Sequence, residues 1–215
     1  MRKHNFMDQV LSDIDRGLRT VFVKQNATRS PSNNTAGQTS SKHELSDKDK
    51  KLSARLMRVN HAGEIAAQGL YHGHFLTAQN EKVKQQLHHS AVEEEDHLAW
   101  CNKRLEELDD QTSILSPLWY AGSYTMGAAV GLFGDKWILG FISETEKQVV
   151  AHLDKHLARM PEQDDISREI INKMRAEEAM HDQTAREAGA EELPKAVKLA
   201  MQAVSKVMTK TSYWI

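Results

Sequence analysis

Two Glu-x-x-His units interrupt helical apolar patterns, and they limit what this chain can fold into more than any other feature. Residues 93–97 read EEEDH and residues 177–181 read EEAMH. Around the first unit, apolar residues recur at steps of three and four: Val83, Leu87, Ala91, Leu98, Cys101, Leu105 and Leu108. That spacing is typical of an amphipathic helix, and the series is continuous only if Glu94 belongs to it. We therefore expect Glu94 to face a core.

Carboxylates replace aliphatic side chains in two further helical patterns. Glu178 and His181 continue the apolar series of their helix, and Glu146, in preference to Glu144, continues another. An ionised carboxylate that is buried alone costs several kcal/mol, so each of these side chains needs a partner of opposite charge. Neither lysine nor arginine occupies these apolar faces near the glutamates. A shared cation is the simplest remaining partner.

The spacing of these residues indicates that the cation is a metal ion. A glutamate and a histidine at positions i and i+3 share one helical face and can reach one ion. Glu94 follows Glu64 by 30 residues and Glu178 follows Glu146 by 32, so the chain reads as two similar helix pairs. Periodicity supports Glu64 less well, because it lies at the edge of its apolar face. The candidate metal-binding and catalytic residues are Glu64, Glu94, His97, Glu146, Glu178 and His181.

This ligand set predicts a fold. Four inward glutamates and two histidines on four helices are the ligands of the ferritin-like di-metal carboxylate bundle. Two divalent ions would neutralise the four carboxylates, and oxygen-rich sites with one imidazole per ion suit iron or manganese better than zinc or copper. Other acidic residues of these segments are expected on solvated helix faces: Glu93, Glu95, Asp96, Glu144 and Glu177.

Two residues close to the candidate ligands allow more than one interpretation. Tyr71 lies two turns beyond Glu64 on roughly the same face, where core packing is favoured over a redox role. His152 lies near the apolar face that contains Glu146. It is either a hydrogen-bonded core histidine or a residue that orients a metal ligand.

The pattern along the whole chain predicts an all-α fold, namely an antiparallel four-helix bundle with a long apolar crossover and extra terminal helices. No strand pattern with turn punctuation is present. Helices are expected at 49–78, from Asn80 to about 108, from Asp135 to near Pro161, at 165–188 before Gly189, and after Pro194. Residues 1–24 read as an amphipathic N-terminal helix, 25–48 as a flexible linker rich in Ser, Asn and Thr, and 49–215 as the bundle.

Residues 111–142 form the crossover, and its first 24 residues, up to Gly134, carry no charge. This length qualifies as a membrane-span candidate. Pro117 and the glycines make its hydrophobicity moderate, so a buried crossover or a segment in the membrane interface is favoured. The spacing of Gly127 and Gly131 is weak evidence for a span, since small residues also permit close packing in soluble bundles.

Composition excludes some function classes. The formal net charge of −2 gives no positive field to attract nucleic acid, so no nucleic-acid partner is expected. A single cysteine, Cys101, excludes an internal disulfide and a multi-cysteine metal site. The N-terminal residues are charged throughout and contain no secretory signal.

Four stretches of the sequence resemble one known family. RVNHAGEIAAQGLY at 58–71, EEEDHL from 93, PLW at 117–119 and EEAMHD at 177–182 are similar to the demethoxyubiquinone hydroxylases of ubiquinone biosynthesis. The resemblance extends from about residue 50 to the C-terminus. It implies two iron ions (Fe2+/Fe3+), one held by Glu64, Glu94 and His97 and the other by Glu146, Glu178 and His181, with Glu94 and Glu178 placed to bridge.

The resemblance also implies an activity and a location. The expected enzyme is a di-iron, O2-dependent monooxygenase that hydroxylates the ring of a polyprenylated demethoxyquinol. Its partners would be the quinol, O2, the membrane surface, other ubiquinone-biosynthesis proteins and an external electron donor. No glycine-rich nucleotide motif follows a strand in the chain, so the electrons come from outside it or from the quinol. The expected location is peripheral, on the cytoplasmic side of the cell membrane.

The residues alone leave other functions open. Iron oxidation and storage of the ferritin type would use the same ligand set, but it does not explain the apolar crossover. Manganese catalase and a hydroxylase of modified tRNA remain within the fold, and the weak net charge disfavours the second. A non-enzymatic, membrane-docking helical adaptor would require a purified protein without metal.

Overall fold

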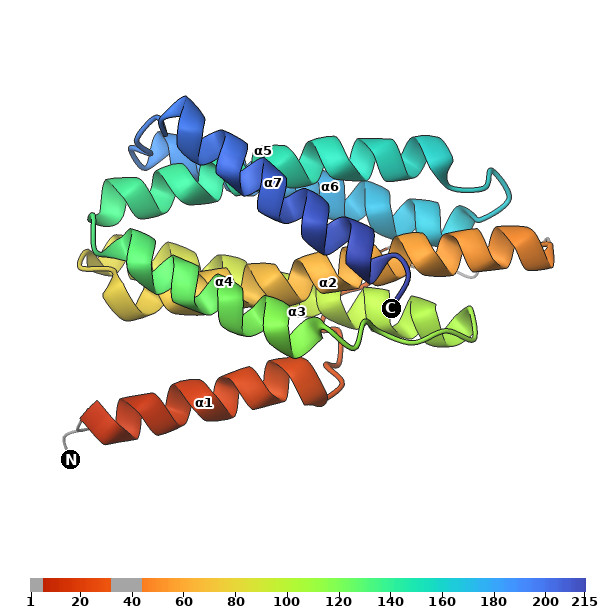
Figure 1. Cartoon of the computed structure of the whole chain (residues 1–215), viewed down its shortest axis with the longest axis horizontal. Helices are drawn as coiled ribbons and strands as arrows, with labels where there is room; N and C mark the ends of the chain where they lie inside the picture. Colours follow the sequence, from red (N-terminus) through yellow and green to blue (C-terminus); the bar gives the residue numbers. More distant parts are fainter. Residues whose placement is uncertain (1–5, 32–43) are drawn as a thin grey trace.

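The computed structural model describes residues 6–31 and 44–215, and all regular structure in these ranges is helical. The helices are α1 (Phe6–Phe22), α2 (Asp47–Thr77), α3 (Glu81–Glu107), α4 (Ser116–Gly131), α5 (Asp135–Arg159), α6 (Asp165–Glu187) and α7 (Lys195–Ser212). Figure 1 shows α2, α3, α5 and α6 as a bundle, with α1, α4 and α7 outside it. The predicted all-α fold is confirmed.

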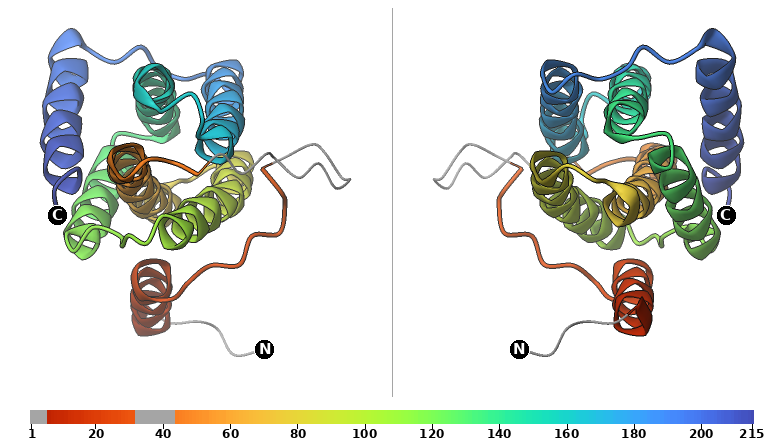
Figure 2. Two further views of the ribbon diagram at one scale, coloured as in Figure 1. Left: turned by 90° about the vertical axis from the view of Figure 1, so that its right-hand side faces the viewer. Right: turned by 90° about the vertical axis from the view of Figure 1, so that its left-hand side faces the viewer.

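The bundle consists of two hairpins with short connections. Residues 78–80 join α2 to α3, where the side chain of Asn80 accepts a hydrogen bond from the Lys82 backbone N–H at 2.8 Å. Residues 160–164 join α5 to α6, where Asp164 accepts one from the Ser167 N–H at 3.0 Å. Such side-chain caps satisfy N–H groups that the first helical turn leaves without partners. The two hairpins lie one above the other in the end views (Figure 2).

The crossover contains a helix, α4, that the sequence analysis did not assign. Apolar and small residues lie on all its faces, so no polar face marks a helical period. It packs very closely on α2, because glycines meet backbone at the contact. A Cβ on Gly127 would lie 2.4 Å from the Leu70 carbonyl oxygen, and one on Gly73 would lie 2.1 Å from that of Tyr124. Gly127 thus serves close helix packing within the molecule.

No helix within residues 6–31 and 44–215 combines the length and the apolar character needed to cross a bilayer. Large apolar side chains are nevertheless exposed near both ends of α4: Ile114, Leu118, Leu132 and Phe133.

The four bundle helices share one order of residues along their length. Each has one apolar segment in a cluster around Leu56, Leu105, Leu153 and Ile171, and another in a cluster around Tyr71, Leu87, Ile138 and Ala185. Each bundle helix has one candidate glutamate, and in its sequence this glutamate lies between the two apolar segments. A layer of carboxylates therefore crosses the bundle with an apolar layer on either side.

The N-terminal helix α1 packs on α4 at the edge of the molecule. Tyr124 donates a hydrogen bond to Asp13 at 3.1 Å, and Gly17 lies against the Tyr120 ring. Of the linker expected at 25–48, residues 32–43 lie outside the described residues. Residues 23–31, which we call the strap, run from α1 across the bundle, and Thr28 and Arg29 contact buried acidic residues of α3 and α6. The expected division into domains stays a prediction.

Candidate metal centre

The structure brings all six candidate residues together in the carboxylate layer. One ligand atom from each of Glu64, Glu94, His97 and Glu178 lies within 4.8 Å of the others. Glu94, Glu146, Glu178 and His181 form a second group by the same measure. Glu94 and Glu178 belong to both groups, so the two groups share these carboxylates. Each of the six residues is at most 6% exposed.

The histidines face the shared glutamates with their Nδ1 atoms. His97 Nδ1 lies 2.8 Å from Glu94 Oε2 and 3.3 Å from Glu178 Oε1. His181 Nδ1 lies 3.2 Å from Glu94 Oε1 and 3.3 Å from Glu178 Oε2. Glu64 lies on the side of His97, with Oε2 at 3.7 Å from Nδ1. The centre therefore has two halves of matching composition around two common carboxylates.

The donor set fits two hard or borderline cations. Three buried atoms in the centre have no hydrogen-bond partner among the described residues: Glu94 Oε1, Glu178 Oε2 and His181 Nδ1. Buried polar atoms are normally satisfied, and here the unsatisfied atoms converge on one another. Four carboxylates and two imidazoles give oxygen-rich, N-containing sites of the kind that iron and manganese occupy.

The pKa directions in the centre show how strongly the charges interact. Burial and the charge of Glu94 raise the pKa of Glu64 well above its ordinary value, and burial and Glu178 do the same for Glu146. Burial alone would lower the pKa of His181, but the adjacent carboxylates of Glu178 and Glu94 raise it to about 12. The pKa of His97 is raised well above its ordinary value, because Glu94 and its other carboxylate partners outweigh burial. The negative charge of this layer thus favours the protonated forms of Glu64, Glu146 and the two histidines when no metal ion is bound.

The outer nitrogen of each histidine binds a second carboxylate. His97 Nε2 lies 2.8 Å from Glu177 Oε2, and His181 Nε2 lies 2.9 Å from Glu93 Oε2. Such contacts fix which imidazole nitrogen faces a metal and orient the ring. Burial alone would raise the pKa of Glu177, but hydrogen bonds from His97 and Lys173 lower it to about 2. Glu177 therefore accepts these bonds as a carboxylate.

The sequence-based expectation of solvated faces is wrong at three positions. Glu177, Asp96 and Glu144 are buried, because side chains from other elements cover them. Glu177 contacts His97, and Asp96 contacts Thr28 and Arg29 of the strap. Glu93 is half-buried, and Glu95 is exposed as expected.

Tyr71 and His152 take different positions relative to the centre. The Tyr71 hydroxyl donates a hydrogen bond of 2.7 Å to Glu146 Oε1, so this core residue also holds a candidate ligand. His152 Nε2 has no hydrogen-bond partner in the described part of the chain. Burial, together with Lys155 and Arg159, lowers the pKa of His152 to about 4, so its ring is neutral at physiological pH.

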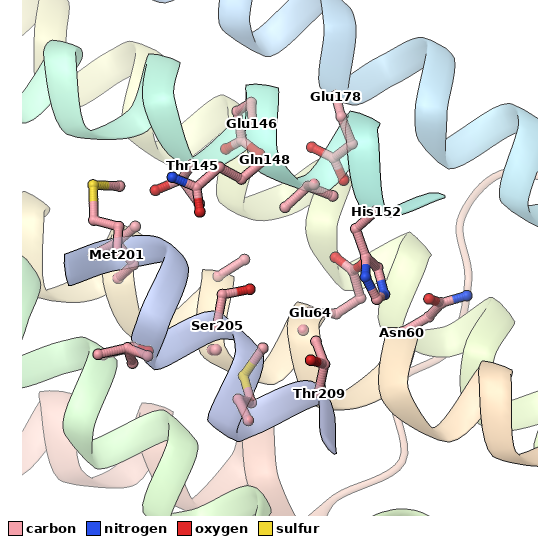
Figure 3. Close-up of a pocket in the computed structure, with 18 of the residues that line it drawn as sticks. Asn60, Glu64, Thr145, Glu146, Gln148, His152, Glu178, Met201, Ser205 and Thr209 are labelled. Atoms are coloured by element: carbon pink, nitrogen blue, oxygen red, sulfur yellow. The ribbon is translucent and has the colours of Figure 1, made fainter. Parts of the chain in front are cut away.

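A cavity leads from the surface to one side of the centre. Its lining includes Glu64, Glu146 and Glu178 at the inner end and apolar residues of α2, α4, α5 and α7 elsewhere. The empty space between its walls is about 980 Å³, a figure that includes solvent at the open mouth. In Figure 3, Met201, Ser205 and Thr209 of α7 face Glu146, Gln148 and His152 of α5 across this space.

Comparison with known proteins gives the family. The sequence model of the family described as "Ubiquinone biosynthesis protein COQ7" matches residues 51–212. The chain belongs to the COQ7 family. Proteins named 3-demethoxyubiquinol 3-hydroxylase are similar along this member's full length. The one from Acinetobacter baumannii strain ATCC 17978 is 48% identical, with both chains wholly covered, and the one from Legionella pneumophila strain Paris is 49% identical, again over both whole chains.

A solved structure confirms the ferritin-like bundle of this COQ7 family member. A thioferritin from Bacteroides fragilis, described as bacterioferritin-related, superposes with a TM-score of 0.54 at 19% identity. The match covers 76% of this chain and 92% of that one. At this identity the likeness concerns the fold alone.

Sequence reasoning on this COQ7 family member missed the outer carboxylates and the cavity. The sequence does contain a pattern that marks Glu93 and Glu177 as outer partners of the histidines. Each of them immediately precedes the glutamate of a Glu-x-x-His unit. The two units face each other, and each supplies the outer partner of the other unit's histidine. For the part of the lining that α7 supplies, the sequence contains a partial signal, because Met201, Val204 and Met208 recur at steps of three and four.

Proposed function

We propose that this protein is a di-iron monooxygenase that hydroxylates the ring of a polyprenylated demethoxyquinol with O2 in ubiquinone biosynthesis. The observation that carries the proposal is the buried, duplicated set of four glutamates and two histidines at the inner end of an apolar cavity. Membership of the COQ7 family and the names of its relatives support the substrate class.

The six residues would hold the two irons. Glu64 and His97 would bind one ion, Glu146 and His181 the other, and Glu94 and Glu178 would bridge both. Iron held there would supply the redox chemistry that activates O2 for hydroxylation. Glu177 and Glu93 hold the imidazoles in the orientation that ligation needs. The second oxygen atom leaves as water, so two electrons and two protons must arrive from an external donor or from a quinol.

The cavity would bind the quinol ring with its tail toward the mouth. Val149, Phe141 and Leu70 are among the apolar side chains of its wall. Two buried polar atoms on this wall, Oδ1 of Asn60 and Nε2 of His152, have no hydrogen-bond partner within the described residues. A ring hydroxyl can donate to either atom, which would fix the ring near Glu64 and Glu178. The apolar wall excludes water from the reacting atoms.

Peripheral attachment to the cytoplasmic side of the cell membrane would bring the tail to the cavity. Met126 of α4 and Val204 of α7 line the cavity and are 37% and 51% exposed. Further exposed apolar residues lie on the same helices or just beyond α4: Leu118, Leu132, Phe133, Leu199 and Val207. A lipid surface would bury this area, and other ubiquinone-biosynthesis proteins could contact the rest.

The test uses protein purified without oxygen. Its iron content is measured, then O2 and a demethoxyquinol are added with a reductant, and the product is identified by mass spectrometry. The expected results are two irons per chain and a quinol heavier by one oxygen atom, which carries the label when 18O2 is used. Iron oxidation without quinol hydroxylation would favour the iron-storage alternative, and protein without metal would favour the adaptor.

A further inference from the structure

The strap places one arginine against the acidic residues behind the metal centre. Arg29 Nη1 lies 2.7 Å from Glu177 Oε1 and 3.4 Å from Glu93 Oε1, and its Nε lies 2.6 Å from Asp96 Oδ2. The three carboxylates come from both α3 and α6. One guanidinium therefore connects the two hairpins at the level of the candidate ligands.

The position of Arg29 is fixed from several directions. Its carbonyl oxygen accepts a hydrogen bond from Trp100 Nε1 at 2.9 Å, and its guanidinium lies 5.8 Å from the centroid of the same ring. The backbone N–H of Thr28 donates to Asp96 Oδ1 at 2.6 Å. The Arg29 side chain is 35% exposed, whereas its partners Asp96 and Glu177 are 2% and 9% exposed. The arrangement is more constrained than a surface ion pair.

Arg29 reaches both histidines through the outer carboxylates. Glu177 accepts a hydrogen bond from Nε2 of His97, and Glu93 accepts one from Nε2 of His181. We propose that Arg29 is a positioning residue for both halves of the metal centre, holding Glu177 and Glu93 against the imidazoles of His97 and His181. The inference rests on the proposed function, because it assumes that the six residues bind metal.

Charge explains why this position needs an arginine. Glu177 has a second cation, Lys173, at 3.0 Å, whereas Arg29 is the cation that lies against Asp96 in the described structure. Without the guanidinium, three neighbouring carboxylates would repel one another behind the centre. A planar guanidinium can bind several carboxylate oxygens at once, and a lysine ammonium acts as a single point charge. Replacing the arginine should therefore tilt Glu93 and Glu177 away from the histidines.

The test is anaerobic titration of the full-length, metal-free protein with Co2+, followed by its visible ligand-field absorption. Arg29→Ala is compared with Arg29→Lys and with Lys24→Ala. Lys24 is a matched control, because it is a strap residue whose ion pair with Glu106 lies on the surface. Loss of an outer partner of a metal ligand typically lowers affinity by about 10- to 100-fold. We expect a loss in that range with a changed spectrum for Arg29→Ala, a smaller loss for Arg29→Lys, and no change for Lys24→Ala.

The outcomes separate this inference from the proposed function. If the unaltered protein binds no Co2+ or iron, the proposed function fails and the inference falls with it. If the unaltered protein binds two ions and Arg29→Ala binds them with the same affinity and spectrum, only the inference is overturned. Equal losses of Co2+ affinity in Arg29→Ala and Lys24→Ala would assign the effect to the strap as a whole. That result would also overturn the inference. Should Arg29→Ala fail to fold, judged by circular dichroism, Arg29→Lys provides the comparison.

Discussion

Nε2 of His97 on α3 lies 2.8 Å from Oε2 of Glu177 on α6. Glu177 immediately precedes Glu178, whose Oε1 is 3.3 Å from the other ring nitrogen of the same histidine. The imidazole thus lies between two consecutive glutamates of the opposite helix. His181 has the matching relation to Glu93 and Glu94. Each of the two Glu-x-x-His units, with the glutamate before it, therefore contacts the histidine of the other unit across the bundle.

Removing one shared carboxylate should impair both halves of the centre. We expect Glu178→Ala to lose metal at one site at least and to lose all hydroxylation, because Glu178 belongs to both ligand groups. Iron per chain and hydroxylated product measure the two effects. Glu169→Ala, an exposed position on the same helix, is the control and should match the unaltered protein. A Glu178→Ala protein with two irons and normal turnover would refute the ligand assignment.

Metal binding should release protons. Carboxylates raise the pKa of His181 to about 12 despite its burial, so its imidazole is protonated at neutral pH, whereas a metal ligand must be neutral. Protons and metal compete, so the affinity for Co2+ should fall as the pH is lowered from about 8 to about 6. Calorimetry at one pH in two buffers of different ionisation enthalpy measures the release. Identical heats in both buffers would contradict this.

Filling the cavity should block the quinol and spare the metal. Ala67 lines the cavity one turn from Glu64, and we expect Ala67→Phe to lower kcat/KM at least about tenfold, which corresponds to ~1.4 kcal/mol. Iron content should stay unchanged, because Ala67 is not a ligand. Ala203→Phe, at an exposed position of α7 outside the lining, introduces the same side chain as a control. Normal kinetics in Ala67→Phe would place the substrate elsewhere.

The exposed apolar residues that directly follow α4 should contribute to membrane attachment. Leu132 and Phe133 are 80% and 71% exposed, and burying such side chains contributes about 1.5–3 kcal/mol each. Glutamates at both positions should weaken binding to liposomes at least about tenfold. Sedimentation with liposomes measures the effect, and the control places glutamates at exposed apolar positions of α6, Ile166 and Met180. Unchanged binding by the Leu132/Phe133 variant would remove this surface from the attachment.

A methyl group added at the close contact between α2 and α4 should lower the stability of the protein. Gly127→Ala would place Cβ 2.4 Å from the Leu70 carbonyl oxygen, and overpacking of this kind costs roughly 1–3 kcal/mol. Gly122→Ala lies on the same helix with no atom within 4 Å of the new Cβ. It should raise stability by about 0.5–1 kcal/mol, since alanine favours helix over glycine. Thermal unfolding compares the two, and equal Tm values would contradict the packing.

The sequence alone determined the four bundle helices and the six inward residues. Periodicity is a local property of a helix, so a glutamate in an apolar series is buried wherever that face packs. The duplicated Glu-x-x-His spacing then indicated which helices had to meet. Glu64 was least secure from periodicity and depended on the resemblance, and the structure places it 3.7 Å from His97. Its role as a ligand, like that of the other five, stays a prediction.

Only the tertiary structure decided which further residues meet these six. Glu93 and Glu177 lie off the apolar series, and their contact with histidines depends on how α3 and α6 face each other. Arg29 belongs to a polar segment with no periodicity, and packing alone brings it to the centre. The cavity likewise arises where α4 and α7 cover α2 and α5. A helical pattern reports which side of its own helix is apolar, whereas contacts between distant segments depend on how the whole chain packs.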